Sequence, residues 1–96
     1  MIPHIFLSIV IPTRNQKEAL AATLQSIVPQ MSDEVEVVIN DNSTNKETAA
    51  LVRAMFKKPN VRYFRDEPNL GIDHYVLRGI ARAHGMYIWW MGDDEI

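Results

Sequence analysis

The sequence contains no cysteine, only four glycines in 96 residues, and no excess of positive charge. Without cysteine there are no disulfides, cysteine-based zinc sites or thiol nucleophiles, which is consistent with a reducing, cytoplasmic compartment. Ten Lys and Arg against twelve Asp and Glu give a net charge of −2, so we expect no nucleic-acid partner. The uncharged opening, residues 1–13, contains two prolines and is too short for a transmembrane segment. It also lacks the basic start of a signal peptide.

Hydrophobic residues make up 47% of the chain, a globular composition that suits one domain. Their spacing alternates between apolar runs typical of buried strands and helical periodicity. We predict strands at residues 5–11, 35–39, 61–64 and 86–91. Capping signatures at Asn15 and Thr44 predict helices that end before Pro29 and Pro59, and residues 72–83 form a third helix with Gly85 as its C′ residue.

Strands that alternate with helices predict an α/β fold, with a mainly parallel sheet between two helical layers. Right-handed crossovers that reverse direction once give the strand order 3-2-1-4. In that order the first and last strands are neighbours at a topological switch point, where open α/β sheets bind ligands beyond the carboxyl ends of their strands. We therefore expect the site at residues 12–14, 40–43 and 92–95.

Asp93 and Asp94 follow the last strand directly. Adjacent carboxylates at a strand exit repel each other unless a cation is shared, and hard oxygen ligands favour Mg²⁺ or Mn²⁺. A solvated acidic end without a metal is the alternative. No glycine-rich phosphate loop follows the first strand, which disfavours a dinucleotide or Walker-type site. Asp41 is suited either to a hydrogen bond with a base or ribose, or to a turn, and these alternatives stay open.

Four segments in this order resemble family 2 glycosyltransferases of the GT-A fold. The first strand and turn, LSIVIPTRN at residues 7–15, is similar to the family's opening segment, and VVIND at 37–41 is similar to its V-V-D-D strand. The segment NLG at 69–71 matches an N-x-G element, and residues 85–94 match the strand that ends in the D-x-D metal motif. Gly92 replaces the first acid of that motif, a G-D-D variant similar to abequosyl- and rhamnosyltransferase relatives.

The resemblance implies a role for each matched position. Asp94 is the metal ligand, and Asp93 reaches the metal or the ribose. The implied nucleotide-binding residues are Pro12, Thr13, Arg14, Asn40, Asp41 and Asp93, and the implied donor contacts are Asn69, Gly71 and Asp73.

By this resemblance, residues 1–96 are the nucleotide-sugar-binding subdomain of a cytoplasmic transferase, with peripheral membrane association open for the full-length enzyme. The donor is a nucleotide diphosphate sugar, and the acceptor is a saccharide or a lipid-linked sugar, as in polysaccharide biosynthesis. The catalytic base is expected beyond Ile96, so we assign no catalytic residue and expect this chain alone to be inactive. Apolar residues of the last strand predict pairing with another copy. The alternative function is a receiver- or flavodoxin-like binding module, with Asp66 near the position of a receiver's phospho-acceptor.

Overall fold

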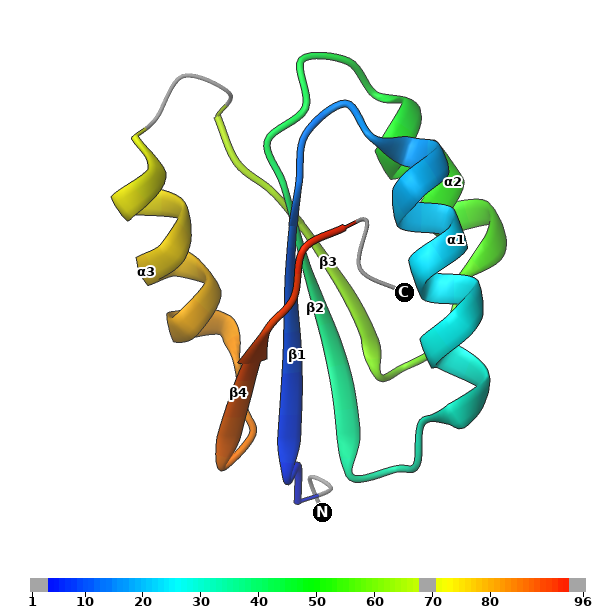
Figure 1. Ribbon diagram of the computed structural model, residues 1–96, viewed down its shortest axis with the longest axis vertical. Helices are drawn as coiled ribbons and strands as arrows, with labels where there is room; N and C mark the ends of the chain where they lie inside the picture. The colour runs from blue at the N-terminus through cyan, green and yellow to red at the C-terminus, as the bar shows by residue number, and fades with distance from the viewer. Residues whose placement is uncertain (1–3, 68–70, 94–96) are drawn as a thin grey trace.

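The computed structural model describes residues 4–67 and 71–93, which form a parallel sheet with helices on both faces (Figure 1). In chain order the elements are β1 Leu7–Thr13, α1 Lys17–Ile27, a 3₁₀ helix Val28–Gln30, β2 Val35–Asp41, α2 Glu47–Met55, β3 Val61–Arg65, α3 Ile72–Arg82 and β4 Tyr87–Trp90. The strand order is β3-β2-β1-β4. Helices α1 and α2 cover one face and α3 the other (Figure 1). The predicted three-layer α/β fold and strand order 3-2-1-4 are therefore confirmed.

The hydrophobic core lies between the sheet and the α1–α2 layer. Alternate side chains of the two central strands point to this face, because successive residues of a strand face opposite sides. The core consists of Ile9, Ile11, Leu20, Leu24, Val28, Val37, Ile39, Val52, Phe56 and Met91. This dry layer is the main apolar contribution to stability, at roughly 1.5–3 kcal/mol for each large side chain fully buried.

Strand β1 continues through Pro12 to Thr13, so the predicted end at Ile11 was wrong. In this strand, Val10 accepts a hydrogen bond from Met91 of the β4 side, whereas Thr13 accepts one from Asn42 of the β2 side. Because the bonding direction alternates along a strand, the missing N–H of Pro12 faces the β4 side. Paired residues of β4 end there, at Trp90, so proline costs no bond within the ladder. The extra residues carry β1 into the predicted site.

Both helices of the α1–α2 layer begin without the predicted side-chain caps. The N-cap residues are Gln16 and Lys46, and neither makes a capping hydrogen bond through its side chain. Asn15 instead adopts a positive φ of 52°, a left-handed conformation in which asparagine is enriched. Its side chain is thereby available to the neighbouring loop rather than to its own helix.

Gly85 is not the left-handed C′ residue that the sequence predicted. Helix α3 ends at an extended Ala83, and no glycine among the described residues has a positive φ. A Cβ added at Gly85 would lie 2.7 Å from both the backbone nitrogen and Oγ of Ser8. Glycine is therefore required here by the close approach of the chain to β1, where the Gly85 N–H donates to Ser8 Oγ at 2.8 Å.

The sheet face beneath α3 carries buried polar groups beside Val10 and Val38, in contrast to the apolar core face. Buried Glu36 accepts hydrogen bonds from Ser8 at 2.6 Å, from Arg62 at 2.9 Å and from the His84 backbone at 2.7 Å. Burial alone would raise the pKa of Glu36, but these hydrogen bonds and the Arg62 charge hold it below its ordinary value. The chain just after α3 is thus fixed to the sheet through a buried carboxylate.

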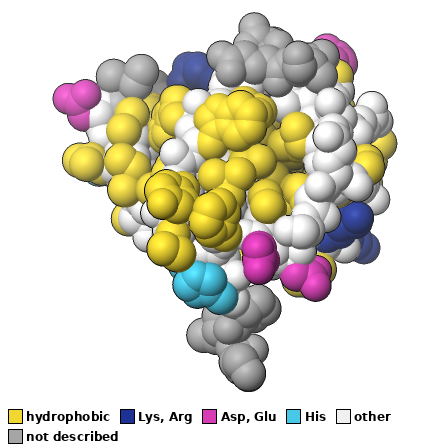
Figure 2. Space-filling model, turned by 60° about the horizontal axis from the view of Figure 1, so that its bottom comes forward, with side chains coloured by type: hydrophobic (Ala, Val, Ile, Leu, Met, Phe, Trp, Pro, Cys, Tyr) yellow, Lys and Arg dark blue, Asp and Glu magenta, His cyan; other side chains and the backbone are white. Residues whose placement is uncertain are grey.

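A hydrophobic patch remains on the outside of the sheet (Figure 2). The four residues of β4 are all at least 40% exposed, and Phe6 and Met86 beside them are exposed as well. Within residues 4–67 and 71–93, none of the helices has the length and apolar composition needed to cross a bilayer.

Candidate nucleotide site

A pocket opens at the carboxyl ends of the central strands, between β1 and α3, with a volume of about 250 Å³. It is lined by Pro12, Thr13, Arg14, Asn40, Asn42, Tyr75 and Trp90. Four of these are residues that the sequence predicted for nucleotide binding. The pocket lies where β1 separates β2 from β4, which is the predicted switch point.

The segment after β4 is tied to the end of β1 and to α1 by direct hydrogen bonds. Thr13 Oγ1 donates to Asp93 Oδ2 at 3.0 Å, and Thr23 Oγ1 of α1 donates to the Asp93 backbone oxygen at 2.6 Å. The parallel pairing of β1 with β4 causes this proximity, because it sets Val10 opposite Trp90. Two segments that are eighty positions apart in the chain therefore meet beside the pocket.

Asp41 lies beneath the loop after β2 rather than in the pocket wall, with a side chain that is fully buried. One carboxylate oxygen accepts hydrogen bonds from the Ser43 N–H, at 2.9 Å, and from the Ser43 hydroxyl. The other accepts the Tyr63 hydroxyl, and Arg65 lies 3.6 Å away. This is the turn role that the sequence left open. A contact of Asp41 with a base or ribose stays a prediction.

Tyr63 is fixed as the donor in that arrangement. Burial, together with the hydrogen bond to Asp41 and the charge of Asp41, raises the pKa of Tyr63 to about 12. The phenol therefore stays protonated across the physiological range. Arg65 Nη2 donates to the Ser43 carbonyl at 2.9 Å and Nη1 to the Asn45 carbonyl at 2.8 Å, so the loop after β2 is held from both sides.

Asn15 joins the two loops that face the pocket. Its backbone N–H donates to Ser43 Oγ at 2.8 Å, and its side-chain oxygen accepts from the Thr44 N–H at 3.1 Å. The left-handed conformation of Asn15 makes both contacts possible at once. The loops after β1 and β2 therefore form one connected surface before any ligand arrives.

Asn40 is positioned by charged residues from α3. Arg82 Nη1 donates to Asn40 Oδ1 at 2.7 Å and to Asp66 Oδ2 at 3.0 Å. Asn40 Nδ2 is the one buried side-chain nitrogen or oxygen without a partner among the described residues. Asn40 therefore enters the pocket wall with its carbonyl oxygen already committed to Arg82.

Asp66 is buried and bonded to two arginines of α3. Arg78 Nη1 and Arg82 Nη2 approach Asp66 Oδ1 at 2.8 and 2.7 Å. Burial alone would raise the pKa of Asp66, but the hydrogen bonds and charges of Arg82 and Arg78 hold it below its ordinary value. A carboxylate buried under two guanidinium groups is poorly placed to accept a phosphoryl group, which disfavours the receiver-like alternative.

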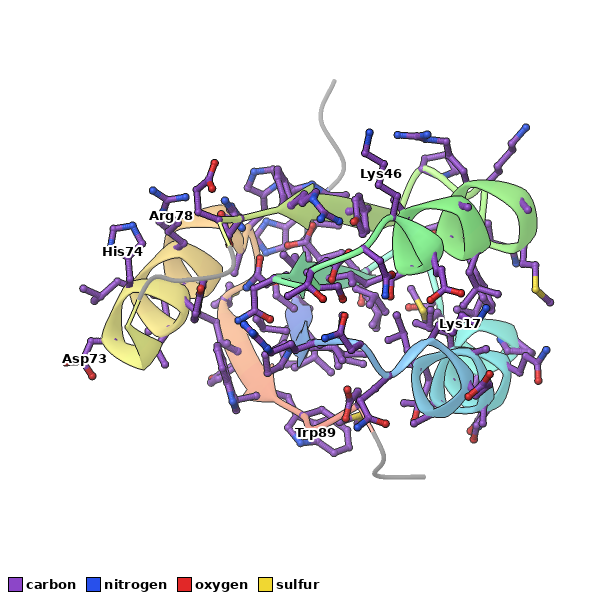
Figure 3. The ribbon with its side chains drawn as sticks, turned by 90° about the horizontal axis from the view of Figure 1, so that it is seen from above. Lys17, Lys46, Asp73, His74, Arg78 and Trp89 are labelled. Carbon is purple, nitrogen blue, oxygen red and sulfur yellow. The ribbon has the colours of Figure 1, made fainter. Side chains whose placement is uncertain are left out.

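The other predicted site residues are divided between the surface and the undescribed part of the chain. Asp94 and Asn69 lie outside the described residues. Gly71 is exposed and precedes α3. Figure 3 shows Asp73 and His74 on the outer side of α3, pointing away from the sheet. The metal role of Asp94 and the donor contacts of Asn69, Gly71 and Asp73 stay predictions.

The sequence analysis did not predict two residues of the pocket wall as site residues. Tyr75 lies in the predicted helix at residues 72–83, and Trp90 in the predicted strand at residues 86–91. Tyr75 is indeed buried, and its hydroxyl donates to the Glu67 carbonyl at 2.5 Å. Strand alternation could have indicated Trp90, because every second residue of a strand shares a face. Trp90 lies on the face of β4 that is turned toward α3. Asn42 lies in the segment 40–43, which the strand order had already selected for the site.

Oxygen atoms are the ligands available for a cation at this edge of the sheet. The Asp93 carboxylate and the Thr13 hydroxyl lie together there, and such hard ligands fit Mg²⁺ or Mn²⁺. Among the described residues no group of three or more His, Asp or Glu side chains is placed to hold a metal ion. The described part of the site therefore supplies few candidate ligands.

Comparison with known proteins shows which family the chain is similar to. The family model described as Glycosyl transferase family 2 matches residues 8–96. The abequosyltransferase RfbV of Salmonella typhimurium is 33% identical over 93 residues, which are 93% of this chain. A glucosyltransferase of Campylobacter jejuni, named GalNAc(5)-diNAcBac-PP-undecaprenol beta-1,3-glucosyltransferase, is 24% identical over 91 residues, or 93% of this chain.

Solved structures share the fold of this chain. The crystal structure of S. aureus TarS superposes with a TM-score of 0.79 at 26% identity over 94% of this chain. Mannosyltransferase PcManGT from Pyrobaculum calidifontis, solved in complex with GDP-Man and Mn²⁺, gives 0.75 at 21% identity over 95% of it. The chain spans only part of each relative: 28% of the abequosyltransferase, 29% of the glucosyltransferase, 17% of TarS and 28% of the mannosyltransferase.

Proposed function

The chain belongs to glycosyl transferase family 2, and we propose that residues 1–96 form the nucleotide-sugar-binding subdomain of such an enzyme. In this proposal the subdomain holds a nucleotide diphosphate sugar complexed with Mg²⁺ or Mn²⁺. The full enzyme transfers the sugar, with inversion, to a saccharide or lipid-linked acceptor. The acceptor site and the catalytic base lie in a further part of the enzyme, so this chain alone supplies donor binding.

The observation that carries the proposal is the hydrogen bond, 3.0 Å long, from Thr13 of the pocket wall to Asp93. It brings the acidic segment after β4 to the end of β1, which lies beside the end of β2. A nucleotide diphosphate needs both environments, because its base and ribose take directional hydrogen bonds while its phosphates need a cation.

Each wall of the pocket has a proposed role. Asn40 and Asn42 supply polar contacts to the base or ribose, and the planar guanidinium of Arg14 stacks on the base. Asp41 acts from beneath, since it holds Ser43 and so fixes the loop that carries Asn42. Pro12 and Trp90 supply the apolar surface that excludes water from the bound nucleotide.

The acidic end of β4 is proposed to hold the cation, with Asp94 as its ligand and Asp93 reaching the ribose or the metal. When bound, the ion stabilises the negative charge that develops on the departing diphosphate. Thr13 and Thr23 orient Asp93 through its carboxylate and its backbone oxygen, so this segment keeps its place before the donor arrives.

Calorimetric titration with UDP, dTDP, GDP and CDP, with and without Mn²⁺, tests the proposal. We expect one nucleotide to bind, with an affinity that Mn²⁺ raises by about tenfold or more, equivalent to about 1.4 kcal/mol. Asp94→Ala should remove the Mn²⁺-dependent part of the affinity and leave the metal-free part. Asp33→Ala is the matched control, because it removes an exposed acid of the turn before β2.

Two results would contradict the proposal at different points. Absence of binding by all four nucleotides, in a chain whose circular dichroism shows it folded, would argue against a nucleotide site and for the binding-module alternative. An Asp94→Ala variant that keeps the full Mn²⁺ effect would overturn the metal assignment while leaving the nucleotide pocket in place.

A further inference from the structure

A second concave surface lies between α2 and β3, on the sheet edge opposite β4. This groove has a volume of about 570 Å³. It is lined by Ala49, Val52, Arg53, Phe56, Lys57, Lys58, Pro59, Val61 and Tyr63. Val52 and Phe56 are buried and form an apolar floor. The proposed nucleotide site shares none of these lining residues with the groove.

The rim of the groove is positively charged. Arg53, Lys57 and Lys58 are exposed, and none of them makes a hydrogen bond or ion pair with another described side chain. None of the described residues that line the groove is acidic, although the chain as a whole carries a net charge of −2. Three uncompensated cations around an apolar floor are complementary to a segment that combines acidic and apolar side chains.

Past Val61, whose N–H donates to Lys58 O, the backbone of β3 is open on the side away from β2. Asn60 O accepts from the Val37 N–H, and the Asp66 N–H donates to Asp41 O. Even-numbered residues of this stretch therefore bond to β2, and the odd-numbered ones face the free edge, because bonding direction alternates along a strand. Tyr63 thus presents its N–H and C=O outward, and no described strand pairs with this edge.

We propose that this groove binds an extended segment of a protein partner that carries both acidic and apolar side chains on one face. The segment adds to the free edge of β3 as a further strand through main-chain hydrogen bonds. On the face toward α2, its apolar side chains lie over Val61 and Tyr63 and its carboxylates reach Arg53, Lys57 and Lys58, whereas the side chains of its other face point away from the groove. The apolar floor lies below the basic rim, which suits the side chains of a strand better than the flat surface of an anionic bilayer.

A synthetic peptide of about eight residues, with valine and glutamate at its odd positions and threonine at its even positions, is the probe. We expect it to shift backbone amide signals of β3 and of the second half of α2 in ¹⁵N–¹H spectra. Lys57→Glu with Lys58→Glu should weaken binding by at least about tenfold at low salt, because two attractive charges become repulsive. Lys46→Glu changes an exposed lysine before the start of α2 (Figure 3) and should leave the affinity within about twofold.

Two further probes separate strand addition from other modes of binding. N-methylation at odd positions removes the N–H donors of one edge of the peptide, and N-methylation at even positions removes those of the other edge. Strand addition therefore predicts that one of these two peptides binds and the other does not. Equal binding of both would overturn the proposal, as would shifts confined to the lysine side chains. Binding to phosphatidylserine vesicles without binding to the peptide would also overturn it, in favour of a membrane surface.

Discussion

Gly79 shows how a single atom sets the distance between α3 and the sheet. A Cβ added there would lie 2.5 Å from Asn40 Nδ2, 2.9 Å from Val10 Cγ1 and 3.0 Å from Trp90 Cζ3. Two of these neighbours also line the pocket. The absence of a side chain at Gly79 therefore allows α3 to approach closely enough to form the pocket wall.

We predict that Gly79→Ala destabilises the chain by about 1–2 kcal/mol, because overpacking outweighs the gain of about 1 kcal/mol in helix propensity. Urea unfolding followed by circular dichroism measures the change. Gly71→Ala is the matched control: no atom of the described residues lies within 4 Å of a Cβ added there, so its cost should stay below about 1 kcal/mol, the loss typical of a helix N-cap. A Gly79→Ala variant as stable as the parent would contradict the proposed close contact.

At the scale of elements, the attachment of α3 to the sheet depends on ionised groups. Helices α1 and α2, in contrast, pack on the sheet through the hydrophobic core. Asp66 bonds to Arg78 and Arg82 of α3, and Glu36 bonds to the chain just after it at His84. Both carboxylates are buried, and their pKa values lie below the ordinary ones. Their ionised forms are therefore favoured in the folded state and stabilise it.

We predict that stability falls as the pH decreases below about 4, the ordinary range of these acids. A carboxylate with a lowered pKa contributes fully above the ordinary value, and this contribution is lost as the pH falls through the lowered one. Urea midpoints between about pH 7 and pH 3 measure the loss. Asp66→Asn should be less stable at neutral pH and should show a shallower pH dependence, whereas exposed Asp33→Asn should follow the parent. Parallel curves for Asp66→Asn and the parent would contradict this account.

Periodicity was sufficient to predict the elements and their order, but not the side chains that join them. Residues 35–39 read as a strand whether or not Glu36 is buried, because alternation only assigns faces. The burial of Glu36 depends on Arg62, Ser8 and the backbone of His84, which are distant in sequence. Asn15 likewise looked like a helix cap, since capping and loop bridging use the same side-chain oxygen. Long-range partners of this kind have no local pattern.

At the scale of the molecule, the sheet has two edges of opposite character. The β3 edge adjoins the basic groove, whereas β4 is uncharged and exposed: Tyr87 is 59% accessible and Trp89 50%. Figure 3 shows Trp89 projecting from the sheet, away from α3. The six exposed apolar side chains at this edge present roughly 600 Å², at about 100 Å² each. That area is close to the roughly 800 Å² that each partner contributes to a standard interface.

We therefore predict that the chain self-associates through β4, because an unpaired, uncharged strand edge is a template for pairing with a second copy. Sedimentation velocity at about 100 μM, a concentration at which a standard interface of micromolar affinity is mostly formed, should show a dimer. Trp89→Lys places a charge in the middle of the edge and should weaken association by at least about tenfold. Met55→Lys is the matched control, since Met55 is 52% exposed on α2. A parent chain that sediments as a monomer, or equal effects of the two lysines, would argue against association through this edge.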